Sequence, residues 1–163
     1  MSAKFALYHP NAKGTGSALK ITRILPLDEI GGKIYTDGVF RFELAPQRGG
    51  RLFDWDRSLS FCFDSIELAS MLRVLRGESE ALQDGKGVSV FDDDSPDHQM
   101  LVRFMHRIEP TQGYFLEVRE PDESAVASGK YIGGFFFSPP EAMALELAIE
   151  QSLHLLVFGA PNI

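Results

Sequence analysis

The chain is poor in the residues and segments that anchor a protein to a membrane or staple it covalently. It has one cysteine, Cys62, so no disulfide can form within it, which is typical of a protein in a reducing compartment. Cys62 stands between two phenylalanines and is expected to be a small buried residue. No apolar run approaches the roughly 18 residues of a membrane span, and no signal-peptide core opens the sequence. These absences favour a cytoplasmic protein without a membrane partner.

The sequence also lacks a constellation for catalysis or metal binding. Its histidines, His9, His98, His106 and His154, lie in separate segments without metal-ligand spacing. Gly14–Ser17 is glycine-rich but lacks the lysine and the following helix of a phosphate loop. Asp92–Asp97 lacks the glycine and terminal glutamate of a calcium loop, and both it and Glu120–Glu123 are predicted to be solvated turns. We expect no enzyme, no cofactor and no metal site.

Basic residues are scarce overall but are unevenly distributed. The chain has 16 Lys and Arg against 23 Asp and Glu, a net charge of −7 that by itself disfavours nucleic acid. Residues 1–63, however, contain nine of the basic and only six of the acidic residues, a local balance of +3. Residues 64–163 contain seven and 17, a balance of −10. The overall charge therefore understates how basic one face of the protein can be.

The hydrophobic pattern predicts four strands and then a helix in each half of the chain. Apolar and polar residues alternate with the period of half-buried strands, and each strand set ends at a helix cap. In the first half the strands are Lys4–His9, Ala18–Leu25, Val39–Ala45 and Arg51–Phe63 (one bent strand or two), with a connection over Leu27–Gly38, a turn at Pro46–Gly50 and a helix capped by Asp64. In the second half they are Gly87–Phe91, Gln99–Glu109, Tyr114–Glu120 and Lys130–Phe137, before a helix that runs from a cap at Ser138 to about Phe158.

The two halves match each other at a shift of 74 residues. Phe61 and Phe63 align with Phe135 and Phe137, and each pair is followed by a cap residue, a glutamate three positions later and a helix. This pattern predicts a duplicated β-β-β-β-α unit, with pseudo-repeats of about 1–77 and 78–163 in a single 1–163 domain. The fold class is α+β, with two four-stranded antiparallel sheets.

The final helix is apolar around most of its circumference. Only Glu146, Glu150 and His154 form a polar stripe, so the helix needs to be buried on more than one side. Two small sheets offer little cover, which favours self-association through this helix over a central position within one monomer.

The chain resembles the Whirly family of single-stranded DNA-binding proteins. The matching segments are Gly38–Pro46, Asp54–Arg57 and the Leu59–Phe63 strand that leads into the first helix, with Gly16–Leu19 where the family has a Lys-Gly-Lys-Ala-Ala-Leu motif. The resemblance implies two sheets packed crosswise and helices that form the core of a homotetramer. A transcriptional-coactivator fold and kinetoplastid guide-RNA-binding proteins are similar. The two family lysines are not matched in Gly14–Ser17, which puts the motif's roles in assembly and near DNA in doubt.

Single-stranded nucleic acid is held by cations along its backbone and by aromatic rings that stack on bases. The site predicted on this basis consists of Lys20, Arg23, Arg41, Arg51, Phe53, Trp55, Arg57, Arg103, Arg107 and Tyr114. Strand alternation predicts that Lys20, Arg41, Arg103 and Arg107 point outward, and that Phe40 lies in the core. Trp55 lies between two aspartates. Two roles are equally expected for it: packing under a bent strand, or stacking on a base.

The function expected from these features is binding of single-stranded DNA with little sequence preference. The processes open to such a protein are transcription regulation, recombination and protection of exposed strands. One alternative is binding of RNA. Another is an oligomeric protein scaffold without nucleic-acid function, which the net charge of −7 and the unmatched lysines favour.

Overall fold

The computed structural model describes residues 3–121 and 129–159, which form an α+β fold with two antiparallel sheets and two helices. Sheet 1 consists of β1, β2, β5 and β7, paired in that order, with β6 added beside the far end of β5. The bounds of these strands are Ala3–His9, Ser17–Ile24, Val39–Gly49, Leu59–Asp64 and, for β6, Leu52–Phe53. Sheet 2 has the order β11-β10-β9-β8, with bounds Tyr131–Phe137, Gly113–Arg119, Gln99–Arg107 and Val88–Phe91.

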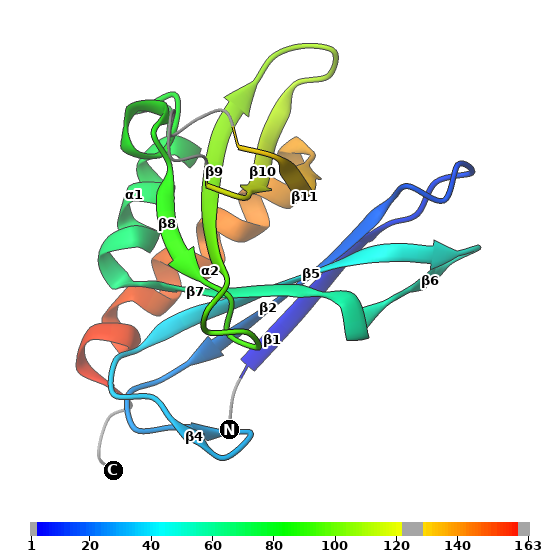
Figure 1. The fold of residues 1–163 in the computed structure, drawn as a ribbon. Helices are drawn as coiled ribbons and strands as arrows, with labels where there is room; N and C mark the ends of the chain where they lie inside the picture. The colour runs from blue at the N-terminus through cyan, green and yellow to red at the C-terminus, as the bar shows by residue number, and fades with distance from the viewer. Residues whose placement is uncertain (1–2, 122–128, 160–163) are drawn as a thin grey trace.

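The strands of the two sheets cross each other, as Figure 1 shows. In that view β5 and β7 run across the molecule while β8 and β9 run down it, and helices α1 (Ser65–Leu75) and α2 (Pro139–Phe158) lie beside and behind sheet 2. One continuous core joins the facing sides of both sheets to both helices. Its largest fully buried side chains include Phe40, Phe42, Phe61, Phe104, Phe135 and Phe137. The expected core position of Phe40 is confirmed.

Both helices start where the caps predict. The Asp64 side chain accepts from the Glu67 N–H at 2.9 Å, and the Glu67 carboxylate accepts from the Asp64 N–H at 2.9 Å. Ser138 and Glu141 form the same reciprocal capping box at the start of α2. In each half, a four-stranded antiparallel meander thus ends in a capped helix at equivalent positions. This arrangement fits the duplication, which stays a prediction.

The predicted turn at Pro46–Gly50 is wrong, because β5 continues as a strand to Gly49. The reason is a tertiary contact of Gln47, whose side chain is buried. Its amide oxygen accepts from the N–H groups of Asn11 and Gly16, and its amide nitrogen donates to the Asn11 and Gly50 carbonyls. Gln47 therefore binds the end of β5 to the β1–β2 loop. Local turn propensity contains no information about this contact.

Two predicted segments divide into shorter elements. The stretch predicted as the connection Leu27–Gly38 forms a small hairpin of β3 (Glu29–Ile30) and β4 (Lys33–Ile34). The stretch Arg51–Phe63 divides into β6, a 3₁₀ turn at Trp55–Arg57 and β7, so the two-strand alternative holds. A second 3₁₀ segment covers Leu82–Gly85. Among the described residues, neither helix is long and apolar enough to cross a membrane.

Candidate nucleic-acid interface

The outer face of sheet 2, which points away from sheet 1, concentrates cations. Arg103 and Arg107 on β9 and Arg119 on β10 share this face. The carboxylate that lies among them is that of Glu117, which is buried and accepts from Arg103 at 3.1 Å and from Arg119. On the described strands β9 and β10, three arginines share the outer face with one carboxylate, that of Glu117, which pairs with Arg103 and Arg119. The charge balance of these four side chains is positive. We call Arg103, Arg107, Phe115, Arg119 and Tyr131 the arginine face.

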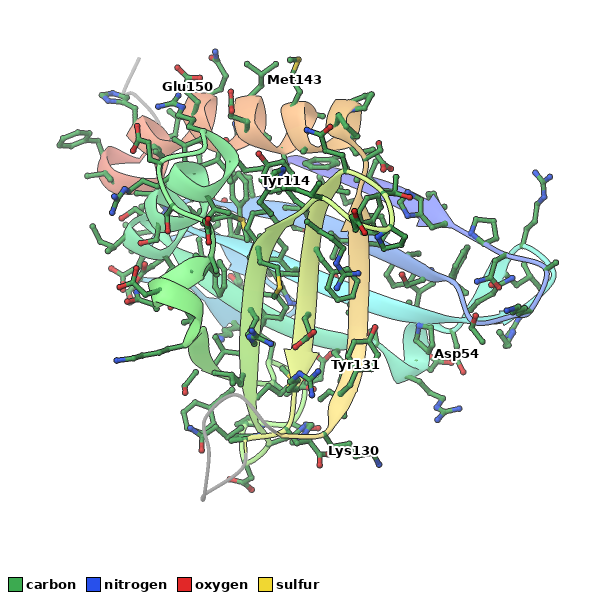
Figure 2. All side chains as sticks on the ribbon, turned by 90° about the horizontal axis from the view of Figure 1, so that it is seen from above. Asp54, Tyr114, Lys130, Tyr131, Met143 and Glu150 are labelled. Atoms are coloured by element: carbon green, nitrogen blue, oxygen red, sulfur yellow. The ribbon has the colours of Figure 1, made fainter. Side chains whose placement is uncertain are left out.

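Two aromatic rings of the arginine face lie over a glycine. The guanidinium carbon of Arg107 is 4.3 Å from the ring centre of Phe115, and that of Arg119 is 6.0 Å from the ring centre of Tyr131. A Cβ at Gly134 would come within 2.6 Å of Phe115 Cζ and 2.5 Å of Tyr131 Oη, so the missing side chain leaves room for both rings. Tyr131 is 48% exposed, and burial, followed by the charge of Glu117, raises the pKa of its hydroxyl. Figure 2 shows Tyr131 beside Lys130 at the end of β11 away from α2.

The outer face of sheet 1 contains a second combination of cation and ring. Lys20 points outward as predicted, and its Nζ lies 4.2 Å from the ring centre of Trp55. Trp55 is partly exposed, so both of its predicted roles stay open. Glu43 is the cross-strand neighbour of Lys20 on β5 and offsets part of its charge.

Arg41 also points outward, but carboxylates surround it. Its guanidinium forms ion pairs with Glu43 at 3.0 Å, Asp93 at 3.0 Å and Asp94 at 3.3 Å. The predicted solvated turn at Asp92–Asp97 is therefore wrong for its first residues: Asp92 is 5% exposed and Asp93 packs onto sheet 1. Of the other predicted acidic turn, Asp122 and Glu123 lie outside the described residues.

A cavity of about 400 Å³ opens where β11 crosses the end of sheet 1. The four segments that carry the Whirly resemblance all contribute to its lining, with Gly16 and Ser17, Leu44 to Pro46, Arg57 and Leu59. Tyr131 and the glycine pair Gly133–Gly134 form the wall that belongs to sheet 2. The cavity thus connects the arginine face with the motif residues of sheet 1, and it contains a cation, a ring and a stretch of bare backbone.

Two residues of the predicted site, Arg23 and Tyr114, do not lie on the outer faces of the sheets. Arg23 lies on the same side of β2 as Leu19 and Ile21, and it lines a cavity of about 390 Å³ against α2. Tyr114 shares the inward side of β10 with Leu116 and Val118, stacks on Phe104 at 5.8 Å between ring centres, and donates its O–H to the Leu75 carbonyl at 3.1 Å. Burial, then the charge of Glu146, raises the pKa of its hydroxyl. Strand parity therefore places both side chains on the inner sides of their strands, away from the outer sheet faces.

The remaining predicted residues surround the long hairpin ends of sheet 1. Arg51 is exposed at the β5–β6 turn and lines a shallow cavity with the β1–β2 loop. The Phe53 ring packs on Tyr8, with 5.7 Å between ring centres. Phe115 and Tyr131, whose rings lie on the arginine face, were not among the rings predicted from the sequence. The alternation of Phe115, Glu117 and Arg119 against Tyr114, Leu116 and Val118 was the signal for Phe115. For Tyr131, at the start of its strand, no sequence pattern indicated the side on which the ring lies.

Metal and thiol chemistry find no support in the described part of the chain. Within residues 3–121 and 129–159, no group of three or more His, Cys, Asp or Glu side chains is arranged to hold a metal ion. Cys62 is partly buried with its Sγ 3.3 Å from an Asp93 oxygen. Burial, then the charge of Asp93, raises the pKa of the thiol to about 12, so it stays protonated and unreactive at neutral pH.

Comparison with known proteins finds similarity in structure but not in sequence. No family model matches the chain, and no curated protein matches its sequence. The crystal structure of WHY1 from Arabidopsis thaliana superposes with a TM-score of 0.67 at 17% identity, over 96% of this chain and 86% of that one. The plant transcriptional regulator PBF-2 gives 0.66 at 15% identity, over 98% and 84%. A guide-RNA-binding protein complex solved with its guide RNA gives 0.61 at 15% identity, over 95% and 92%.

These matches cover nearly the whole chain, so the similarity is one of complete topology rather than of a shared sheet. They agree with the crossed sheets and paired helices described above. At these identities the likeness establishes the fold, and the resemblance seen in the short motifs is confirmed at that level. The chain has the Whirly-like fold, α+β with two antiparallel sheets and two helices, which is also the fold of the guide-RNA-binding proteins.

Proposed function

We propose that this chain binds single-stranded DNA with little sequence preference, through the arginine face and the adjoining cavity. The observation that carries the proposal is the alternation of guanidinium groups and aromatic rings on the outer face of sheet 2. Guanidinium groups bind phosphate oxygens whatever the base, and each stacked base contributes roughly 1–3 kcal/mol whatever its identity. Such a surface suits strand protection, recombination or transcription regulation, and none of these requires catalysis.

The relatives in fold support the same class of ligand. One of them is a plant transcriptional regulator, and another was solved in complex with guide RNA. RNA is therefore the second candidate ligand.

The test is fluorescence anisotropy with a labelled oligo-dT of about 30 nucleotides. The expected result is tight binding that weakens with salt and resists a hairpin-duplex competitor. Replacing Arg103 and Arg107 together by alanine should reduce affinity and lower the slope of log K against log salt by about 1.4, or about 0.7 for each lost phosphate contact. An Arg73→Ala/Lys86→Ala variant removes two exposed cations outside the arginine face and serves as the charge-matched control.

Three outcomes change the proposal. Stronger competition by the matched oligo-U than by the same DNA would make RNA the ligand. Equal competition by duplex would remove the single-strand preference. Absence of binding at low salt would overturn the proposal and favour an oligomeric protein scaffold.

We further propose that copies of the chain associate through α2 into a homotetramer. Met143, Leu147, Val157 and Phe158 lie on α2 with 49% to 75% of their surface exposed, and α2 is apolar around most of its circumference. Figure 2 shows Met143 and Glu150 projecting from α2 away from the sheets. Light scattering should give four times the chain mass for the wild type, and Leu147→Asp should lower it. A monomeric wild type at micromolar concentration would overturn this proposal.

A further inference from the structure

The turn between β8 and β9 is attached to a cation of the other sheet. Asp93 Oδ2 accepts from Arg41 Nε at 3.0 Å, and Asp94 Oδ1 accepts from Arg41 Nη2 at 3.3 Å. We call Asp92–Asp94 the acidic turn. Two carboxylates thus approach one guanidinium group from one side, which is how the oxygens of a phosphate group bind an arginine.

Additional hydrogen bonds fix the acidic turn to β7. The Asp93 N–H donates to the Ser60 carbonyl at 2.9 Å, and the Ser60 hydroxyl donates to Asp94 at 3.0 Å. Inside the turn, the Asp94 N–H donates to the Asp92 carboxylate at 2.9 Å. The carboxylates are therefore held in place on the face of sheet 1 rather than moving freely in solvent.

The charge at this position has the wrong sign for nucleic acid while the acidic turn is in place. Arg41 and Lys33, whose Nζ lies 3.7 Å from Asp93, face the carboxylates of Glu43, Asp93 and Asp94. Two cations against three carboxylates repel a phosphate. Without the two aspartate charges, the same position has two cations and one carboxylate, and it adjoins Lys20 on the same face.

We propose that the acidic turn is an intramolecular competitor of nucleic acid, and that Asp93 and Asp94 occupy the phosphate position at Arg41. This proposal rests on the proposed function and concerns its regulation. It limits binding on sheet 1 and directs the strand toward the arginine face. Nucleic acid gains Arg41 only by displacing the acidic turn.

The test compares two variants with the same change in net charge. Asp93→Asn/Asp94→Asn removes the competitor, and Asp84→Asn/Asp97→Asn removes two exposed carboxylates that make no ion pair with Arg41. At about 50 mM NaCl, the first variant should bind oligo-dT roughly three- to tenfold more tightly than the second. Arg41→Ala should weaken wild-type binding by less than about twofold, yet remove the whole gain when combined with the first variant.

The possible outcomes distinguish failure of the competitor proposal from failure of the proposed function. Equal affinities of the two double variants would overturn the competitor and leave the proposed function intact. Failure of every variant, the wild type included, to bind would overturn both proposals. If the first variant does not fold by circular dichroism, Asp94→Asn alone replaces it, because that side chain is 60% exposed. A gain of about twofold over Asp97→Asn is then expected, and no gain would overturn the competitor.

Discussion

The amino group of Lys20 on β2 lies 4.2 Å from the ring centre of Trp55, which belongs to the 3₁₀ turn between β6 and β7. The pair brings together the second strand of the first hairpin and one of the segments that carry the Whirly resemblance. A cation held over an aromatic face contributes roughly 0.5–1 kcal/mol when exposed. This is weak enough for a base to replace the ammonium group on the ring, and Lys20 is then free to meet a phosphate.

Trp55 is the single tryptophan, so its fluorescence reports this position alone. We expect oligo-dT to quench the emission, because a stacked base or a displaced Lys20 changes the surroundings of the ring. The quenching should saturate at the same oligonucleotide concentration as the anisotropy change. Saturated anisotropy with unchanged emission would confine the bound strand to the arginine face, and Trp55→Phe is the control for signals from other groups.

Phe115 and Tyr114 are neighbours in sequence, but substitutions at the two positions should affect different properties, binding affinity and stability. Phe115→Ala removes a ring from the arginine face, so we expect it to weaken single-strand binding by about tenfold, within the range for one stacked base. Tyr114→Phe removes the hydrogen bond to Leu75, so it should lower the free energy of unfolding by about 1 kcal/mol and leave affinity unchanged. Anisotropy and urea titrations on both variants separate the two roles, and a loss of affinity in Tyr114→Phe would contradict the assignment.

Phe115 and Tyr114 also show how far the structure can be predicted from the sequence. Caps, strand alternation and the order of elements follow from local patterns, and the structure confirms the helix starts at Asp64 and Ser138. The attachment of the acidic turn to Arg41 does not, because it joins residues 52 positions apart whose contact depends on how the two sheets cross. The same holds for Gln47, which extends β5 through a side-chain contact with another hairpin.

Gly38 marks a close approach that only the folded structure reveals. A Cβ there would lie 2.5 Å from the Cα of Leu156 in the last turns of α2, so the two backbones would have to separate. We expect Gly38→Ala to lower the free energy of unfolding by about 1–3 kcal/mol. Gly49→Ala, with nothing within 4 Å of the added atom, is the matched control and should change it little. Urea unfolding at one fixed protein concentration makes the comparison, and equal stabilities would contradict the close packing.

The two capping boxes differ in the pKa of their glutamates. For Glu67 of α1, burial raises the pKa, and hydrogen bonding to the Asp64 N–H does not offset it. For Glu141 of α2, burial acts in the same direction, but hydrogen bonds from Ser138 and from His9, whose Nε2 lies 2.7 Å from Oε2, leave the pKa below its ordinary value. Folding therefore favours the charged form of Glu141 and the neutral form of Glu67.

The stability contributed by the Glu141 charge is complete above the pKa of an unfolded glutamate, about 4.3, and is lost as the pH falls through the lower folded value. Glu141→Gln keeps the shape of the capping box but removes that charge. It should lower the free energy of unfolding by about 1 kcal/mol at pH 7, and the difference from wild type should shrink toward zero as the pH falls below 4. Glu67→Gln is the control with the opposite sign, because removing its charge relieves a cost present only at higher pH. Urea titrations between pH 3 and 8 measure both, and equal losses for the two variants at pH 7 would show that the His9 contact contributes nothing to α2.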